Sequence, residues 1–270
     1  MTMVEQRRTR LDQQLVHLGL ATSRTRAAEA IGAGRVFVNG QPQRKAAFKV
    51  SPADHLQVHQ PEKEYVSRAG HKLAGALVTF PAVTVAGKTC LDAGASTGGF
   101  TQVLLGAGAT EVHAVDVGHG QLVPQLRADP RVHVHERLNI RQVGEVMRPQ
   151  SIPLIVSDLS FISLRMVIPA LVEVASTNAD LLLMVKPQFE VGREKIGKGG
   201  VVTDPQDRAE AVAAVVRTAA EYGLSLNGVG RSQLPGQDGN VEFFCWFRRG
   251  QQPSAAEETV AELLDAVDYD

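Results

Sequence analysis

A glycine-rich segment at residues 91–100 combines the residue types that a cofactor-binding turn requires. It reads Leu-Asp-Ala-Gly-Ala-Ser-Thr-Gly-Gly-Phe and begins within an apolar run that is typical of a β-strand. Glycines at such a turn let a ligand approach the backbone, and ligands of open α/β sheets bind beyond the carboxyl ends of the strands. The glycines fall at positions 94, 98 and 99, so the second glycine of the dinucleotide-binding pattern G-x-G-x-x-G is absent.

Two acidic residues near this turn indicate a cationic ligand rather than a phosphate. Asp92 lies two positions before Gly94, where its carboxylate would repel a phosphate and attract a positive charge. Asp116 ends the next predicted strand and could accept hydrogen bonds from a ribose diol. S-Adenosylmethionine carries both an ammonium and a sulfonium group, so the pattern favours this cofactor over NAD. The alternative interpretation is a tight turn that binds no ligand.

The segments on both sides of the turn alternate between strand and helix patterns. Strands are expected at residues 89–92, 112–116, 132–135, 154–158, 181–186, 224–229 and 241–247. Helices are expected from the turn to residue 105, around residues 167–174 and at residues 205–222. Strands separated by helices imply a mostly parallel sheet with right-handed crossovers. The predicted fold class is therefore α/β.

The first sixty residues predict a separate, smaller unit. Leucine spacing and N-cap residues predict helices at residues 10–19 and 24–31, and short strands are expected at residues 35–38 and 55–59. Asn39-Gly40 is a strong hairpin signal. We expect an α+β domain over residues 1–60, a linker over 61–66, the α/β domain over 67–250 and an acidic C-terminal helix or tail over 251–270.

The charge of the chain is unevenly distributed. Its formal net charge is −1, yet residues 1–72 hold 12 basic and 6 acidic side chains, and the last twenty residues hold 6 acidic and no basic ones. Such asymmetry predicts contact with nucleic acid or another polyanion at the basic end. Candidate RNA contacts are Arg7, Arg8, Arg10, Arg24, Arg26, Arg35, Arg44 and Lys45, and in a glycine-rich loop Arg193, Lys195 and Lys198. The alternative is that these side chains form solvated faces.

Composition excludes several classes of protein. A chain that is 44% hydrophobic and 21% charged can bury a core, which argues against disorder. No apolar run approaches the ~20 residues that span a bilayer, and the start lacks the apolar centre of a secretory signal, so we expect a cytoplasmic protein. Cys90 and Cys245 lie in apolar runs and are expected to be buried free thiols, with a redox or catalytic role as the alternative. His133 and His135 lack a cluster of further ligands, so we expect no metal.

Five stretches follow one another across residues 67–250. They read Ser-Arg-Ala-Gly-His-Lys-Leu from residue 67, the turn at 91–100, Ser-Asp-Leu-Ser-Phe-Ile-Ser-Leu from 157, Val-Lys-Pro-Gln-Phe-Glu from 185 and Gly-Asn-Val-Glu from 239. In this order they resemble the FtsJ-like RNA ribose methyltransferases, and the whole chain is similar to the TlyA family. Residues 8–60 resemble the S-four-like RNA-binding fold. This second resemblance is carried by Arg10-Leu11-Asp12, Ser23-Arg24, Ala27, Gly34-Arg35-Val36 and Val38-Asn39-Gly40.

The resemblance implies a Rossmann-like class I methyltransferase with a seven-stranded, mostly parallel sheet. The implied reaction is methyl transfer from S-adenosylmethionine to the 2′-hydroxyl of a cytidine in 23S rRNA. Family members extended at both ends also modify 16S rRNA, and this chain carries both extensions, so we expect both substrates. A second hypothesis is an RNA-binding ribosome-assembly factor without turnover. A third, a membrane-active haemolysin, is disfavoured because no spanning segment is present.

The family also implies site residues. Its catalytic set falls on Lys72, Asp158, Lys186 and Glu242. We expect Lys186 to accept the ribose proton, because burial and a second lysine lower the pKa of a lysine. Lys72 and Glu242 are expected to orient Lys186 and the ribose, and Asp158 to hold Lys186 and the surroundings of the methyl donor. Expected cofactor contacts are Asp92, Gly94, Ala95, Ser96, Thr97, Gly98, Gly99, Asp116, Val117, Asn139 and Phe161.

Three further expectations follow from the same comparison. The segment Lys63-Glu64-Tyr65-Val66 stands where the family often has Arg-x-Trp-Val, which leaves open how tightly the two domains are coupled. The run Asp158-Leu159-Ser160-Phe161 replaces the Asn-Pro-Pro-aromatic motif of base N-methylation, and neither cysteine lies in a loop, as a cytosine-C5 mechanism would need. We expect a monomer that acts on ribosomal RNA or ribosomal subunits, without a membrane partner.

Overall fold

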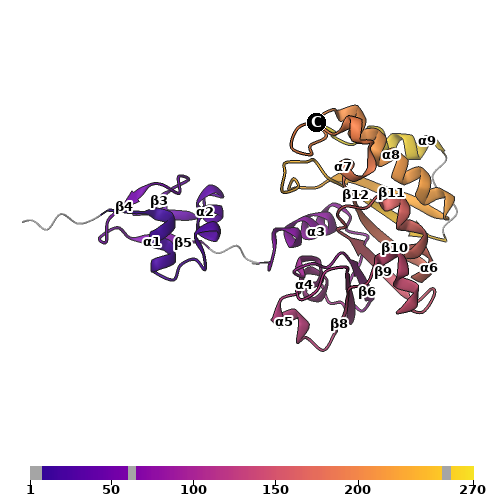
Figure 1. Ribbon diagram of the computed structural model, residues 1–270, viewed down its shortest axis with the longest axis horizontal. Coiled ribbons are helices and arrows are strands. Elements are labelled where there is room, and N and C mark those ends of the chain that lie inside the picture. Colours follow the sequence, from indigo (N-terminus) through magenta and orange to yellow (C-terminus); the bar gives the residue numbers. More distant parts are fainter. Residues whose placement is uncertain (1–7, 60–64, 251–256) are drawn as a thin grey trace, which may run out of the picture. The chain divides into compact units, whose positions relative to one another are not determined.

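The computed structural model describes residues 8–59, 65–250 and 257–270. The chain divides into two compact units, residues 1–64 and residues 65–270, and each is described by itself (Figure 1). Arg7 and the Lys63-Glu64 half of the linker motif lie outside the described residues.

The smaller unit packs two helices against short strands. Its elements are β1 (Thr9–Arg10), α1 (Leu11–His17), α2 (Arg24–Gly32), β2 (Val36–Val38), β3 (Gln41–Pro42), β4 (Lys49–Val50) and β5 (Leu56–Val58). Strand β2 pairs antiparallel with both β3 and β5, and β1 pairs with β4. Leu11, Leu15 and Ile31 are fully buried in its core. The two predicted helices are confirmed, although α1 ends at His17, before Gly19 takes a φ of +70°.

A seven-stranded sheet forms the centre of the larger unit. Its strands are β6 (Thr89–Ala93), β7 (Glu111–Asp116), β8 (Val132–Glu136), β9 (Ile152–Ser157), β10 (Ala175–Val185), β11 (Leu224–Arg231) and β12 (Phe243–Arg249). Their order is β11-β12-β10-β9-β6-β7-β8, and β12 alone runs antiparallel to its neighbours. The predicted mostly parallel sheet of seven strands is confirmed.

Helices cover both faces of this sheet (Figure 1). One face carries α3 (Arg68–Thr79), α4 (Gly99–Gly106) and α5 (Pro124–Arg127). The other carries η1 (Ile140–Glu145), η2 (Leu164–Met166), α6 (Ile168–Val174), α8 (Pro205–Glu221) and α9 (Glu257–Asp265). The remaining elements, α7 (Pro187–Glu190) and η3 (Arg193–Lys195), follow β10.

The alternation of side chains along β10 explains why helices pack on both faces of the sheet. Leu181 and Leu183 are buried on the side of α8, whereas Leu182 and Met184 are buried on the side of α3. A strand buried on both faces reads as an unbroken apolar run, as in a parallel sheet.

Cys90 and Cys245 are fully buried and free, as expected. Burial raises the pKa of Cys90 to about 12, which disfavours the thiolate that reactivity requires.

Three predicted strand ends are wrong by one or two residues. Strand β9 ends at Ser157 and β10 at Val185, so Asp158 and Lys186 follow the strands instead of ending them. Strand β12 begins at Phe243, so Glu242 precedes it. These shifts place all three side chains in the turns that leave or enter the sheet edge.

Among the described residues, none of the helices combines the length and the apolar character that a membrane span requires.

Candidate active site

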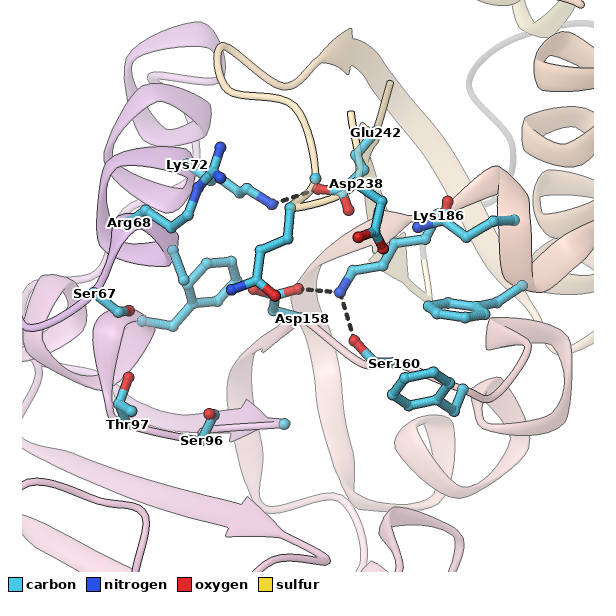
Figure 2. A pocket seen from close by; sticks show the side chains of 18 of the residues that line it. Ser67, Arg68, Lys72, Ser96, Thr97, Asp158, Ser160, Lys186, Asp238 and Glu242 are labelled. Carbon is cyan, nitrogen blue, oxygen red and sulfur yellow. Dashed lines mark hydrogen bonds and ion pairs between the residues drawn. The ribbon is translucent and has the colours of Figure 1, made fainter. Parts of the chain in front are cut away.

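A cavity of about 560 Å³ lies at the carboxyl edge of the central strands. Its walls come from five parts of the chain: α3, the turn after β6, the loop after β9, the segment after β10 and the loop before β12 (Figure 2). The lining includes Lys72, Asp158, Lys186 and Glu242. The structure therefore brings the four residues implied by the family resemblance to one cavity.

The reversed direction of β12 explains how Glu242 reaches this edge. Phe243, the first residue of β12, pairs with Val185, the last residue of β10. Because the two strands are antiparallel, the start of β12 lies beside the end of β10. Glu242 and Lys186 therefore flank the same strand pair, one before it and one after it.

Lys72 and Glu242 form a buried ion pair. Nζ of Lys72 lies 2.5 Å from Oε2 of Glu242, and the side chains are 7% and 2% exposed (Figure 2). Lys72 projects from α3, and α3 is packed on the sheet through the fully buried Leu73. A buried ion pair of this kind is costly to break, because each charge left alone would lose its compensation.

Lys186 has two partners in the loop that follows β9. Its Nζ lies 2.7 Å from Oδ1 of Asp158 and donates a hydrogen bond to Oγ of Ser160 at 2.9 Å (Figure 2). Lys186 is buried, and Asp158 is partly buried. Sequence reasoning did not assign Ser160, although it lies two residues after Asp158 within a recognised motif. The signal that could have identified Ser160 is its spacing from Asp158, which places the oxygens of both side chains within reach of the ammonium group of Lys186.

The turn after β6 is shaped to leave room. Gly94 has a φ of +91°, and a Cβ atom there would lie 2.7 Å from the carbonyl oxygen of Asp158. Gly94 lines the cavity together with Ala95, Ser96 and Thr97. A glycine is needed at position 94 for two reasons, since both its backbone conformation and the close approach of the neighbouring loop exclude a side chain.

Gly98 and Gly99 do not line the cavity and instead permit close packing. A Cβ on Gly98 would lie 2.4 Å from Leu126, and one on Gly99 would lie 2.8 Å from the backbone nitrogen of Gly70. Gly99 therefore lets α4 pack closely against the start of α3, the helix that carries Lys72. Their contribution to cofactor binding stays a prediction.

Asp92 lies beneath the turn rather than in the lining. It is fully buried, and its Oδ2 accepts a hydrogen bond from Oγ1 of Thr101 at 2.6 Å. Its Oδ1 has no hydrogen-bond partner among the described residues. Burial is the main cause that raises the pKa of Asp92 to about 7. Oδ1 of Asp92 is thus a buried acceptor without a donor, and it lies next to a turn where Gly94 has no side chain. This arrangement fits a site that receives a positively charged ligand.

The other expected cofactor contacts are spread around the turn. Asp116 accepts hydrogen bonds from the backbone nitrogens of Ser96 (2.8 Å) and Gly118 (2.7 Å), which places its carboxylate beside the turn. Val117 is exposed, and Asn139 caps η1 by accepting from Arg141. None of Asp116, Val117 and Asn139 lines the cavity.

Phe161 lines the mouth of the cavity. Its side chain is 92% exposed, and its φ of +63° is uncommon for a residue with a side chain. The ring centroid lies 5.2 Å from that of Phe189, which follows Lys186 by three residues. The two rings together give the cavity an aromatic rim.

Several of the predicted RNA contacts are engaged within the smaller unit. Arg10 and Arg24 both bind the buried carboxylate of Asp12, at 2.9 and 3.0 Å. The hydrogen bond from Arg10 and that from Arg24 help to lower the pKa of Asp12 to about 2. These two arginines therefore stabilise the fold of the unit, which the sequence did not indicate. Arg26 forms an ion pair with Glu29. The side chains of Arg8, Arg44 and Lys45 are exposed, and that of Arg35 is half-buried.

The basic loop after α7 does not bring its charges into the cavity. Ile196 and Gly200 line the cavity, whereas the loop's three basic residues do not. Lys195 pairs with Asp207 on α8 at 2.6 Å, and Arg193 and Lys198 are exposed.

The histidines at the sheet edge form a stack. His113 lies on β7 with its Nδ1 3.1 Å from Nε2 of His135, and its ring stacks on His133. Burial and these neighbours lower the pKa of His113 to about 4. In the part of the chain that the structure describes, no group of histidine, cysteine or acidic side chains could hold a metal ion.

Known proteins resemble both units of this chain. The model of the FtsJ-like methyltransferase family matches residues 65–249, and the S4 domain model matches residues 9–56. The 16S/23S rRNA (cytidine-2′-O)-methyltransferase TlyA of Mycobacterium tuberculosis is 55% identical over 243 residues, which are 90% of each chain. The 23S rRNA (cytidine-2′-O)-methyltransferase TlyA of Campylobacter jejuni is 33% identical over 84% of this chain and 95% of its own. The solved structure of a candidate hemolysin from Streptococcus thermophilus has a TM-score of 0.69 at 34% identity, over 96% of this chain and 97% of its own.

Proposed function

Since this chain belongs to the FtsJ-like methyltransferase family, we propose that the cavity at the carboxyl edge of its sheet is where it transfers a methyl group. The protein is an S-adenosylmethionine-dependent rRNA methyltransferase that acts on the 2′-hydroxyl of cytidine. The observation that carries the placement of the reaction is that Lys72, Lys186 and their two carboxylate partners line one cavity beside a cleared turn.

The residues around the turn fit the cofactor. Gly94 leaves space at the turn, and the buried carboxylate of Asp92 lies beneath it with one oxygen free of hydrogen bonds from described residues. Asp116, held at the end of β7, is the residue we assign to the ribose diol of the cofactor. When bound, S-adenosylmethionine supplies an electrophilic methyl group.

Lys186 is the group that we assign to the nucleophile. A ribose 2′-hydroxyl is a weak nucleophile, and its proton has to leave as the oxygen attacks. Lys186 is placed to orient that hydroxyl, and it accepts the ribose proton as the neutral amine, after its own proton has passed to the carboxylate of Asp158 or to solvent. General base assistance contributes roughly 10²–10⁴-fold, and correct positioning of the reacting atoms contributes at least as much.

Lys72 and Glu242 form another part of the cavity wall. Their ion pair ties α3 to the start of β12, so it holds two elements that border the cavity. We assign them the task of keeping the ribose aligned with Lys186. Phe161 at the rim is assigned to contact with the cofactor, as its place in the motif suggests.

The choice of RNA substrate follows from the comparisons and from charge. The identity of 55% to an enzyme named for both 16S and 23S rRNA supports action on both, against 33% to one named for 23S rRNA. Contact with RNA is assigned to the exposed basic side chains of the S4 domain. We further propose that the protein acts as a monomer in the cytoplasm.

Tritiated S-adenosylmethionine and separate ribosomal subunits test this proposal. The protein is expected to label rRNA of both subunits, and reverse transcription at low nucleotide concentration is expected to stop beside a single cytidine in each. Labelling of 23S rRNA alone would remove the 16S assignment. If neither rRNA were labelled while the protein still bound it, the alternative of an assembly factor without turnover would replace the proposal.

A further inference from the structure

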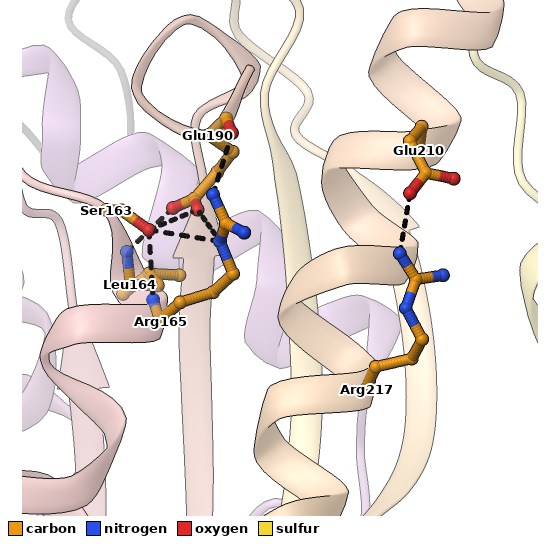
Figure 3. Close-up of polar contacts among 6 residues, drawn as sticks. All are labelled: Ser163, Leu164, Arg165, Glu190, Glu210 and Arg217. Atoms are coloured by element: carbon orange, nitrogen blue, oxygen red, sulfur yellow. Dashed lines mark hydrogen bonds and ion pairs between the residues drawn. The ribbon is translucent and has the colours of Figure 1, made fainter. Parts of the chain in front are cut away.

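Glu190 is a buried carboxylate that none of the roles above uses. It ends α7, four residues after Lys186, and its side chain is 1% exposed. Its Oε2 accepts a hydrogen bond from Oγ of Ser163 at 2.6 Å, and its Oε1 accepts one from the backbone nitrogen of Leu164 at 2.7 Å (Figure 3). A carboxylate that is buried so fully is retained only where its oxygens find donors.

Arg165 adds two more bonds to the same residue. Its Nε lies 3.3 Å from Oε2 of Glu190, and its terminal nitrogen donates to the backbone carbonyl of Glu190 at 3.0 Å (Figure 3). We call the contacts of Glu190 with residues 163–165 the Glu190 clasp. Burial raises the pKa of Glu190, while the bonds from Ser163 and Leu164 act in the opposite direction.

The clasp joins the two segments that carry the polar residues of the cavity. One segment follows β9 and holds Asp158 and Ser160, and the other follows β10 and holds Lys186. At the sheet the two segments start together, because Ser157 pairs with Leu183. At their far ends the clasp joins them again. The short loop between Ser157 and residue 163 is therefore anchored at both ends.

We propose that Glu190 is a positioning residue for methyl transfer. By holding residues 163–165, it sets how closely Asp158 and Ser160 approach Nζ of Lys186. The inference rests on the proposed function, since it assumes that Lys186 orients the ribose hydroxyl. It adds to that function a second requirement, namely that the loop be fixed from a point outside the cavity lining.

A carboxylate suits this position better than any other group. It offers two oxygens to three donors, and hydrogen bonds to an ionised acceptor are about twice as strong as neutral ones. Glutamine keeps the shape and one acceptor oxygen, but it loses the charge that faces Arg165. Alanine leaves the buried N–H of Leu164 without an acceptor.

Single-turnover methyl transfer separates these cases. We expect Glu190→Ala to lower the rate about 10- to 100-fold, because small misplacements of reacting groups have effects of this size, and Glu190→Gln to recover part of the loss. The cofactor dissociation constant, measured by calorimetry, should change much less than the rate, because the turn at Gly94–Thr97 keeps its place and only the Asp158–Phe161 side of the cofactor site lies in the loop. Arg165→Ala, a change at a half-exposed side chain, serves as the variant with the smaller folding risk.

Two matched controls separate positioning from general destabilisation. Glu210→Gln removes a carboxylate whose partner is Arg217, at 2.5 Å on the exposed side of α8, and should leave the rate unchanged (Figure 3). Val215→Ala weakens the buried core on the same helix and should lower Tm without lowering the rate at temperatures well below Tm. Equal losses of rate in Val215→Ala and Glu190→Ala at equal Tm would overturn the proposal.

The decisive comparison is with Ser160. Ser160→Ala should lower the single-turnover rate of the otherwise unaltered protein. It should lower the rate of the Glu190→Ala protein much less, because the clasp acts through Ser160 and Asp158. If the fold-loss of the double variant equalled the product of the two single fold-losses, the proposal would be overturned. Hydrogen exchange of residues 158–166 is the readout that does not need activity. Faster exchange in Glu190→Ala supports the clasp and unchanged exchange refutes it, whereas an absence of methyl transfer by the unaltered protein would refute the proposed function.

Discussion

Nζ of Lys72 and Oε2 of Glu242 lie 2.5 Å apart, although 170 positions separate the two residues in the chain. The lysine comes from the helix before the sheet, and the glutamate comes from the residue before the last strand. Both charges are buried, so each compensates the other. The pair is thus part of the cavity wall and part of the tertiary structure.

This pair should couple stability across the unit. We expect Lys72→Ala or Glu242→Ala alone to lower the free energy of unfolding by about 3–5 kcal/mol, because each leaves an uncompensated buried charge. The double variant should lose less than the sum of the two. Urea unfolding of the four proteins measures the coupling, and strictly additive losses would contradict it.

Lys186 should be essential for the reaction but not for cofactor binding. Lys186→Ala is expected to lower methyl transfer by at least about 10²-fold, because the group assigned to the ribose proton is removed. Calorimetry should still detect S-adenosylmethionine binding of nearly normal affinity. Arg217→Ala, on the exposed side of α8, is the control, and near-normal turnover in Lys186→Ala would exclude the assigned role.

Asp92 should make stability depend on pH. The pKa of Asp92 is raised from 3.8 to about 7 in the folded protein, so between these values folding takes up a proton. Its contribution to stability is therefore present at low pH and is lost as pH rises toward 7, by about 1.4 kcal/mol per pH unit.

Asp92→Asn removes this dependence. The stability of Asp92→Asn relative to the normal protein should increase from pH 4 to pH 7 and then level off. Urea unfolding at several pH values provides the measurement, with Asp265→Asn on the exposed surface of α9 as the control. A difference that does not change with pH would show that Asp92 is ionised throughout.

The basic residues of the smaller unit should fall into two groups. Arg44→Gln should weaken rRNA binding and reduce the slope of log K against log salt concentration by roughly 0.7–0.9, the loss of one phosphate contact. Arg24→Gln should instead lower the thermal stability of this unit, because Asp12 loses a partner. Filter binding over a salt series, together with melting curves, distinguishes the two. An unchanged salt slope in Arg44→Gln would remove that residue from the RNA contacts.

Much of the fold could be predicted, because a strand that is buried on both faces of the sheet consists of consecutive apolar residues. The apolar run at residues 181–185 marks the centre of β10. The first half of β10 shows no such run, since Ser176, Thr177 and Asn178 are polar. The strand continues there through tertiary contacts, for example those of Asp180 with Lys88 and Trp246. These contacts join residues that are far apart in the chain, so no local pattern reveals them.

The candidate site was predictable in its members but only partly in its arrangement. The sequence indicated that Asp158 holds Lys186, yet not that Lys72 pairs with Glu242. The glycine at position 99 suggested ligand contact, which stays a prediction, but not the close packing of α4 against the start of α3 that it permits. Glu190 ends one of the five matching stretches, but its role could not be predicted, because its donors Ser163 and Leu164 are far from it in the chain.

The reversed strand β12 has a consequence for how the protein is made. Glu242 and the strand that follows it leave the ribosome after every other lining residue of the cavity. A chain that stopped short of them would expose the apolar edge of β10 and leave Lys72 buried without its counter-charge. The nascent chain therefore completes the cavity and protects this sheet edge in the same step, and we expect premature termination to yield a fragment that is prone to aggregate.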